Sequence, residues 1–192
     1  MKICFLTELP FFGKVNSTHE NMRTEFAWMN ALDADNVNIR ETLNIPDNSY
    51  DIGILIVPKT LHNYVDIPIL DELKRIANKT SFMQEGPSWF YQDIPLNLSI
   101  HFFNIMNGVD FVLAHNECDR VYYEGLLNKA AYINPTLMIE DAIGTLENVT
   151  RQDVIIGGNF GRWYGGFDSY VVANQFECDI YAPSMGRNFS AS

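Results

Sequence analysis

The sequence predicts an α/β fold: a doubly wound parallel sheet with helices on both faces, in three layers, followed by an incomplete second α/β unit. Two observations support this prediction. Short, continuously apolar runs, which are typical of buried parallel strands, occur at residues 2–6, 52–57 and 111–114. Segments with helical periodicity separate these runs, and such alternation is the pattern of a parallel sheet with right-handed crossovers.

Apolar spacing and turn residues give the order of the expected elements. The expected strands are residues 2–6, 37–39, 52–57, 80–84 and 111–114. The expected helices are residues 19–32, 67–78, 96–107 and 117–129. In the first helix, apolar side chains recur every three or four residues from Met22 to Leu32. Proline or glycine ends several elements, as at Pro58 and Gly108.

The composition excludes several classes of protein. Hydrophobic residues make up 47% and charged residues 19% of the 192 residues, which excludes disorder for most of the chain. The net charge of −11 argues against non-specific binding to nucleic acid or to anionic membranes. The three cysteines form no Cys-x-x-Cys pair, so neither a zinc site nor a disulfide framework is expected. Because no signal peptide and no transmembrane segment is recognised, we expect a cytoplasmic protein.

The chain changes character after the first set of strands and helices. The expected parts are a first domain at 1–134, a connection at 135–152 and the start of a truncated second domain at 153–192. The last part predicts a strand at 153–156, a helix at 167–176 and a strand at 179–182. So few elements cannot close a core of their own. They could extend the first sheet, pack on another chain, as in a homodimer through residues 153–182, or belong to a longer protein, which we favour.

Several polar residues follow the expected strands directly. They are Glu8, Lys14, Glu85, Trp89, His115 and Asn116. Since ligands of doubly wound sheets bind at the carboxyl ends of the strands, these residues are candidates for one cleft. Glu85 can orient a sugar hydroxyl or act as a base, and His115 can act as a base or hydrogen-bond donor. The alternatives are a solvated loop for Glu8 and Lys14, a turn with a buried Trp89, and a helix N-cap for Asn116.

The glycine-rich segment at residues 157–166 lies between an expected strand and an expected helix. Glycine lets the backbone approach a ligand, and a helix N-terminus presents unpaired N–H groups to an anion. Arg162 adds a guanidinium whose geometry suits phosphate. A phosphate-binding loop and an ordinary glycine-rich connection are both consistent with these residues.

The segment from 153 to 187 resembles the opening of the C-terminal domain of GT-B glycosyltransferases, and residues 1–134 resemble their N-terminal Rossmann-like domain in layout. The resemblance implies a hexosyltransferase-like enzyme that transfers a sugar from a nucleotide-sugar to an acceptor, with no metal and no further cofactor. The implied donor-binding residues are Gly158, Arg162, Gly165 and Gly166. Among the polar residues that follow the strands, the candidate catalytic residues are Glu85 and His115, and the candidate acceptor-binding residues are Glu8, Lys14, Trp89 and Asn116. If the natural protein continues beyond Ser192, this chain alone is expected to be inactive.

Two other functions compete with this one. The first is a noncatalytic Rossmann-like module that binds a nucleotide or a partner through the glycine-rich loop. The second is another nucleotide-sugar enzyme, such as an epimerase. The epimerase is the weaker alternative, because the first strand lacks a glycine fingerprint for NAD and the chain has no Tyr-x-x-x-Lys motif.

Overall fold

The structure, a computed structural model, describes residues 1–15, 24–57, 61–84, 94–134, 155–157, 166–177, 179–182 and 187–189. The chain divides into two compact units, Met1–Thr145 and Leu146–Ser192, which are described separately. The boundary between the units lies within the stretch 135–152 that the sequence predicts to be a connection.

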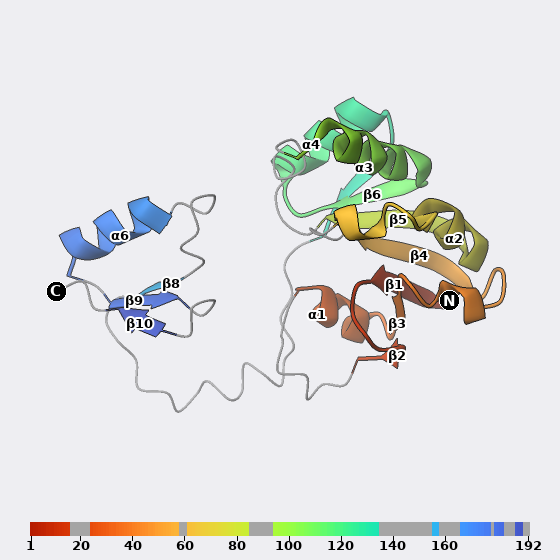
Figure 1. The fold of residues 1–192 in the computed structure, drawn as a ribbon, viewed down its shortest axis with the longest axis horizontal. Helices are drawn as coiled ribbons and strands as arrows, with labels where there is room; N and C mark the ends of the chain where they lie inside the picture. Colours follow the sequence, from red (N-terminus) through yellow and green to blue (C-terminus); the bar gives the residue numbers. More distant parts are fainter. Residues whose placement is uncertain are drawn as a thin grey trace. The chain divides into compact units, whose positions relative to one another are not determined.

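The first unit is built on a seven-stranded sheet (Figure 1). Its strands are β1 (Ile3–Thr7), β2 (Gly13–Lys14), β3 (Asp35–Asn38), β4 (Tyr50–Val57), β5 (Ala77–Gln84), β6 (Phe111–Ala114) and β7 (Ala131–Ile133). Their order is β2-β3-β1-β4-β5-β6-β7, and every neighbouring pair is parallel except β2 with β3. As predicted, β1 and β4 are parallel central neighbours, with Phe5 opposite Ile54.

Helices cover both faces of this sheet and give the predicted three layers (Figure 1). They are α1 (Thr24–Ala31), α2 (Ile69–Ile76), α3 (Leu96–Gly108) and α4 (Glu117–Leu127), with short 3-10 turns η1 (Thr42–Asn44) and η2 (Leu61–Tyr64). On one face, Phe26 and Met29 of α1 pack in a cluster with Phe5 of β1. The opposite face is covered by α2, α3 and α4, where Leu73 and Tyr123 belong to a second cluster. The α/β fold class is therefore confirmed.

Some elements begin or end at other residues than the apolar spacing predicts, because a proline or strand pairing sets the boundary. Helix α2 is shorter than the predicted 67–78, because Pro68 is its N-cap and the chain is extended again from Ala77. Strand β5 pairs with β4 along its whole length. This pairing places residues 77 and 78, which the periodicity assigned to the helix, in the strand instead. The sequence did not predict β2, β7 or β10, which have only two or three residues each.

Gly53 allows helix α2 to lie close to strand β4. A Cβ atom at this position would lie 2.8 Å from both the Cβ of Ala77 and the Cδ1 of Leu73. Real Cβ atoms do not approach other carbons so closely, so a larger residue would push α2 away from the sheet.

The second unit contains a three-stranded sheet in the order β10-β9-β8 and one helix. The elements are β8 (Ile155–Gly157), α6 (Gly166–Gln175), β9 (Asp179–Ala182) and β10 (Arg187–Phe189). Strands β8 and β9 are parallel, and β10 is antiparallel to β9, so these strands form a sheet of their own rather than extending the first one. Val171, Val172 and Phe176 of this unit are exposed. None of the described helices is both long and apolar enough to cross a membrane.

Candidate functional site

The topological switch point of the large sheet lies between β1 and β4. From β1 the chain crosses to β3 on one side, whereas from β4 it crosses to β5 on the other side. In doubly wound sheets, ligands bind outside the carboxyl ends of the strands at this point, because the two loops diverge there. A ligand site is thus expected among the loops that follow β1, β3 and β4.

The loop after β1 is held in place by two asparagines of β3. The buried amide of Asn36 accepts a hydrogen bond from Oγ1 of Thr7 at 2.6 Å and donates one to the carbonyl oxygen of Phe11. Nδ2 of Asn38 donates to the carbonyl oxygen of Leu9 at 2.9 Å. These bonds fold the loop back over β3, and it continues as the antiparallel strand β2.

Three side chains from three different loops meet at this edge, and we call Glu8, Arg40 and Tyr64 the edge cluster. The hydroxyl group of Tyr64 hydrogen-bonds to the carboxylate of Glu8. Cζ of Arg40 lies 4.8 Å from the centre of the Tyr64 ring, and its Nη2 donates to the carbonyl oxygen of Asn63 at 2.6 Å. The edge cluster therefore ties together the loops that follow β1, β3 and β4.

Burial, together with the neighbouring carboxylate, keeps the tyrosine of the edge cluster protonated. Burial of the phenol and its hydrogen bond to the Glu8 carboxylate raise the pKa of Tyr64 above its ordinary value of 10.0, and the opposing effect of Arg40 is smaller. The Tyr64 hydroxyl is thus a neutral donor at physiological pH. A guanidinium carries five N–H donors, so Arg40 can donate to a ligand as well as to Asn63.

The predicted acceptor residues Glu8 and Lys14 lie at different edges of the sheet. Glu8 is part of the edge cluster. Lys14 is opposite Asp35 at the amino end of β3, and its Nζ lies 3.2 Å from carboxylate oxygens of both Asp33 and Asp35. The expectation that Lys14 shares a cleft with Glu8 is wrong, because the loop turns back as β2 and carries Lys14 away from the carboxyl edge.

His115 and Asn116 follow β6 at the same edge as Glu8. Strand β6 lies three positions from β1 in the sheet, so the ends of these strands are about 14 Å apart. Asn116 is the N-cap of α4: its Oδ1 accepts from the backbone N–H of Asp119 at 2.9 Å, and its Nδ2 donates to the Asp119 carboxylate at 2.8 Å. The capping alternative for Asn116 is therefore confirmed, and its role toward an acceptor stays a prediction.

The remaining predicted site residues fall mostly outside the described part of the chain. These are Glu85, Trp89, Gly158, Arg162 and Gly165. Their expected neighbours are described: β5 ends at Gln84, β8 ends at Gly157, and α6 begins at Gly166. The glycine-rich loop thus connects the end of a parallel strand to the start of a helix, as the sequence predicts.

Sequence reasoning missed Arg40 and Tyr64 as site residues. Neither belongs to a motif, and the edge cluster brings together positions that are far apart in the chain. One signal was present: Asn36 and Asn38 alternate with apolar residues, which places two amides on one face of a strand. Buried amides require hydrogen-bond partners, so this pattern indicates a loop folded against the strand.

Two observations concern metal ligands and the buried thiol among the described residues. Within the described ranges, no three His, Cys, Asp or Glu side chains are grouped so that they could hold a metal ion. Burial, together with the charge of Asp35, raises the pKa of the Cys4 thiol to about 12, so this thiol is not a nucleophile at neutral pH.

Comparison with known proteins adds no further constraint. No protein family model, no curated protein and no solved structure matches this chain.

Proposed function

We propose that this chain forms part of a glycosyltransferase of the GT-B type, with the acceptor sugar at the carboxyl edge of the first unit and the donor diphosphate at the second unit. One observation carries the proposal: the second unit has the strand–loop–helix–strand order of a nucleotide-binding half, with β8 parallel to β9. Its loop contains the glycine-rich segment and Arg162.

Physical chemistry supports the donor side of this proposal. The first amides of α6 have no intrahelical acceptor and carry the positive end of the helix dipole, so they favour an anion. A neighbouring guanidinium can hold phosphate oxygens in a bidentate manner. Together these groups would stabilise the diphosphate that leaves when the bond between the sugar and the nucleotide breaks.

The acceptor side of the proposal relies on the carboxyl edge of the large sheet. In the transfer, an acceptor hydroxyl oxygen attacks C1 of the donor sugar, its proton passes to a base, and the nucleoside diphosphate departs. His115 and Glu85 are the proposed bases, since each follows a parallel strand at this edge. Glu8 and Tyr64 can hydrogen-bond to further hydroxyl groups of the acceptor.

The test is a titration of UDP-glucose and GDP-mannose, followed by NMR, on the unmodified chain and on Arg162→Ala. Loss of a charge-assisted contact to phosphate should weaken binding by about 1.5–3 kcal/mol, or roughly 10- to 150-fold. Arg120→Ala is the matched control, because Arg120 pairs with Glu117 and Glu124 on α4 in the first unit. Equal donor affinities for Arg162→Ala and the unmodified chain would contradict the proposal.

A noncatalytic binding module is the second candidate. The observation that favours it is the distance of about 14 Å between the strand ends that carry Glu8 and His115, which does not form a compact catalytic cluster. This candidate predicts donor binding without sugar transfer or donor hydrolysis. An assay for release of nucleoside diphosphate in the presence of mixed acceptors separates the two candidates.

A further inference from the structure

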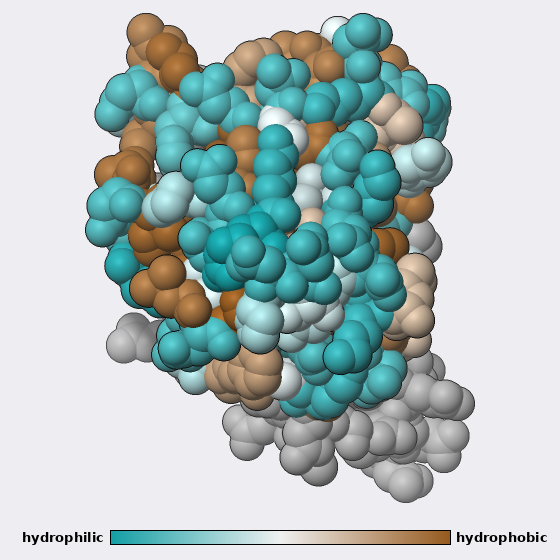
Figure 2. Space-filling view, turned by 90° about the vertical axis from the view of Figure 1, so that its right-hand side faces the viewer, coloured by the Kyte–Doolittle hydropathy of each residue, from teal (hydrophilic) through white to brown (hydrophobic). Residues whose placement is uncertain are grey.

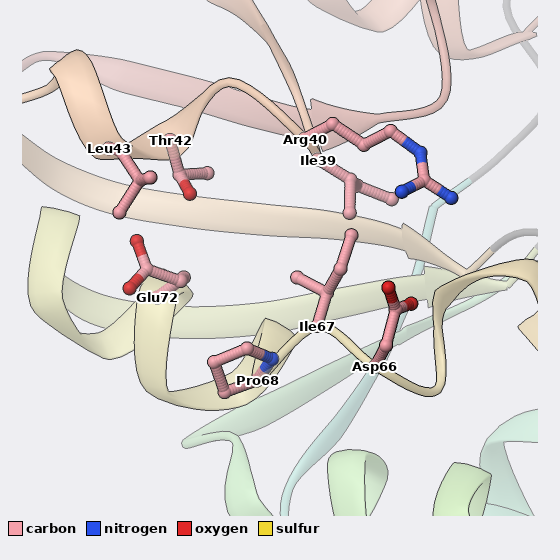
Figure 3. Close-up of a pocket in the computed structure, with 8 residues that line it drawn as sticks. All are labelled: Ile39, Arg40, Thr42, Leu43, Asp66, Ile67, Pro68 and Glu72. Carbon is pink, nitrogen blue, oxygen red and sulfur yellow. The ribbon is translucent and has the colours of Figure 1, made fainter.

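A pocket opens beside helix α2 because one crossover of the sheet lacks an α-helix. The chain passes from β3 to β4 with only the three-residue 3-10 turn η1, whereas the crossover from β4 to β5 contains α2. A single 3-10 turn is too short to fill the helical layer beside α2. A pocket of about 300 Å³ remains between residues 39–43 and residues 66–72 (Figure 3).

The pocket has apolar walls and polar ends. Figure 3 shows Ile39 and Ile67 in the middle, with the guanidinium of Arg40 and the carboxylate of Asp66 at one end. Glu72 lies at the other end, next to Thr42 and Leu43. A ligand that fits must therefore offer an apolar face and hydrogen-bonding groups at its rim.

The charges around the pocket disfavour an anionic ligand. Arg75 donates to a carboxylate oxygen of Glu72 at 2.8 Å, and this bond holds the pKa of Glu72 below its ordinary value. The remaining charges that line the pocket are Arg40 and Asp66, which offset each other. No net positive charge is left at the pocket to attract phosphate, whereas a neutral hydroxyl can donate to Asp66 and accept from Arg40.

The volume limits the size of the ligand. Pockets for small molecules generally enclose about 300–1,000 Å³, so this pocket lies at the lower limit. It suits a unit of about one sugar ring and is too small for a nucleotide-sugar. Sugar rings also have the required chemistry, since their C–H faces are apolar and their hydroxyl groups both donate and accept.

We propose that this pocket is a subsite for a neutral saccharide unit. Arg40 belongs both to the pocket and to the edge cluster, so a saccharide in the pocket reaches the carboxyl edge through this side chain. The acceptor is then an oligosaccharide with one unit at the edge and another in the pocket. The assignment of this saccharide as the acceptor rests on the proposed transferase function, whereas occupancy of the pocket does not.

The experiment is an NMR titration of the full chain with maltose, cellobiose and N-acetylglucosamine. We expect saturable binding in the millimolar range, with the largest methyl shifts at Ile39 and Ile67. Asp66→Ala should raise the Kd at least fivefold. The matched control is Asp71→Ala, which removes another exposed carboxylate two residues into α2 that does not line the pocket, and its Kd should be unchanged.

Three outcomes would overturn the subsite: no saturable shift with any of the three sugars, equal Kd values for Asp66→Ala and the unmodified chain, or tighter binding of inorganic phosphate at the same residues. The donor titration separates this proposal from the proposed function. Saccharide binding without donor binding supports the subsite and contradicts the transferase, whereas donor binding without saccharide binding overturns the subsite alone.

Discussion

The amino and carboxyl edges of the seven-stranded sheet use their charged side chains differently. Figure 2 shows the amino edge as a largely hydrophilic surface. Charged side chains at this edge form ion pairs and hydrogen bonds with other parts of the fold. Lys14 bridges Asp33 and Asp35, and Asp51 accepts from the backbone N–H of Lys2 at 2.7 Å. At the carboxyl edge, the edge cluster joins only loops and borders the switch point. The difference indicates that one edge stabilises the fold and the other is available for recognition.

Arg75 connects four residues at the amino edge. Its guanidinium donates to the carbonyl oxygens of Thr42 and Ile45 at 2.8 and 2.7 Å, and to the carboxylates of Asp47 and Glu72 at 2.8 Å. These bonds fasten the crossover that contains η1 to the end of α2. Arg75 thus replaces, through hydrogen bonds, the packing that a helix would provide in this crossover.

Replacing Arg75 should destabilise the fold more than replacing Asp110 or Tyr64. In Arg75→Met, two carbonyl oxygens and two carboxylates lose their donor, so the urea midpoint should fall markedly. Arg120→Met is the matched control, since Arg120 pairs only along the surface of α4, and we expect its midpoint to fall roughly one third as far or less. Equal shifts would contradict a stabilising role specific to the amino edge.

Asp110→Asn should have a smaller, pH-dependent effect. Burial favours the neutral carboxyl, but bonds from the backbone N–H and hydroxyl of Thr80, at 2.8 and 2.9 Å, outweigh it and lower the pKa of Asp110 below 3.8. A lowered folded pKa means that the stabilisation is complete above the unfolded pKa and disappears as the pH falls through the folded one.

We therefore expect Asp110→Asn to lower the free energy of unfolding by about 1 kcal/mol at pH 7, since the carboxylate is only partly buried. The difference from the unmodified chain should shrink below pH 3.8. Urea unfolding curves at pH 7 and pH 3 measure both values. A difference that is constant between these pH values would show that the hydrogen bonds, and not the charge of Asp110, matter.

Tyr64→Phe should have the smallest effect on stability. It removes one hydrogen bond at an edge where water can replace the lost partner, so the free energy of unfolding should change by less than about 1 kcal/mol. Binding should respond more clearly, because the Glu8 carboxylate loses the hydroxyl group that positions it. We expect the Kd for maltose to rise a few-fold in the NMR titration, and an unchanged Kd would separate the edge cluster from the saccharide pocket.

Local pattern was sufficient to predict the parallel sheet and insufficient to predict the site. The runs at β1, β4 and β6 are apolar and largely buried in β1 and β4, so sequence alone identifies them. The strand of the second unit at Asp179–Ala182 has the predicted bounds. Arg40 and Tyr64 meet only because β3 and β4 are brought beside β1, and the sequence contains no periodicity that reports such a contact. Lys14 shows the opposite error, because the sequence placed it at the carboxyl edge and the structure does not. The two-residue strand β2 turns the chain back along β3, and no apolar pattern in the sequence indicates this strand.

The same short strand has a consequence for how the protein behaves at high concentration. An exposed parallel edge strand is a template on which another chain can add, and this is a route to aggregation. Strand β2 occupies the outer edge of β3 with only two residues, and the second of them is a lysine held between two aspartates. Another chain that approached this edge would meet the charges of Lys14, Asp33 and Asp35, and β2 is too short to form a stable strand pair with it. The turn that takes Lys14 away from the ligand edge thereby protects this side of the sheet from pairing with another chain.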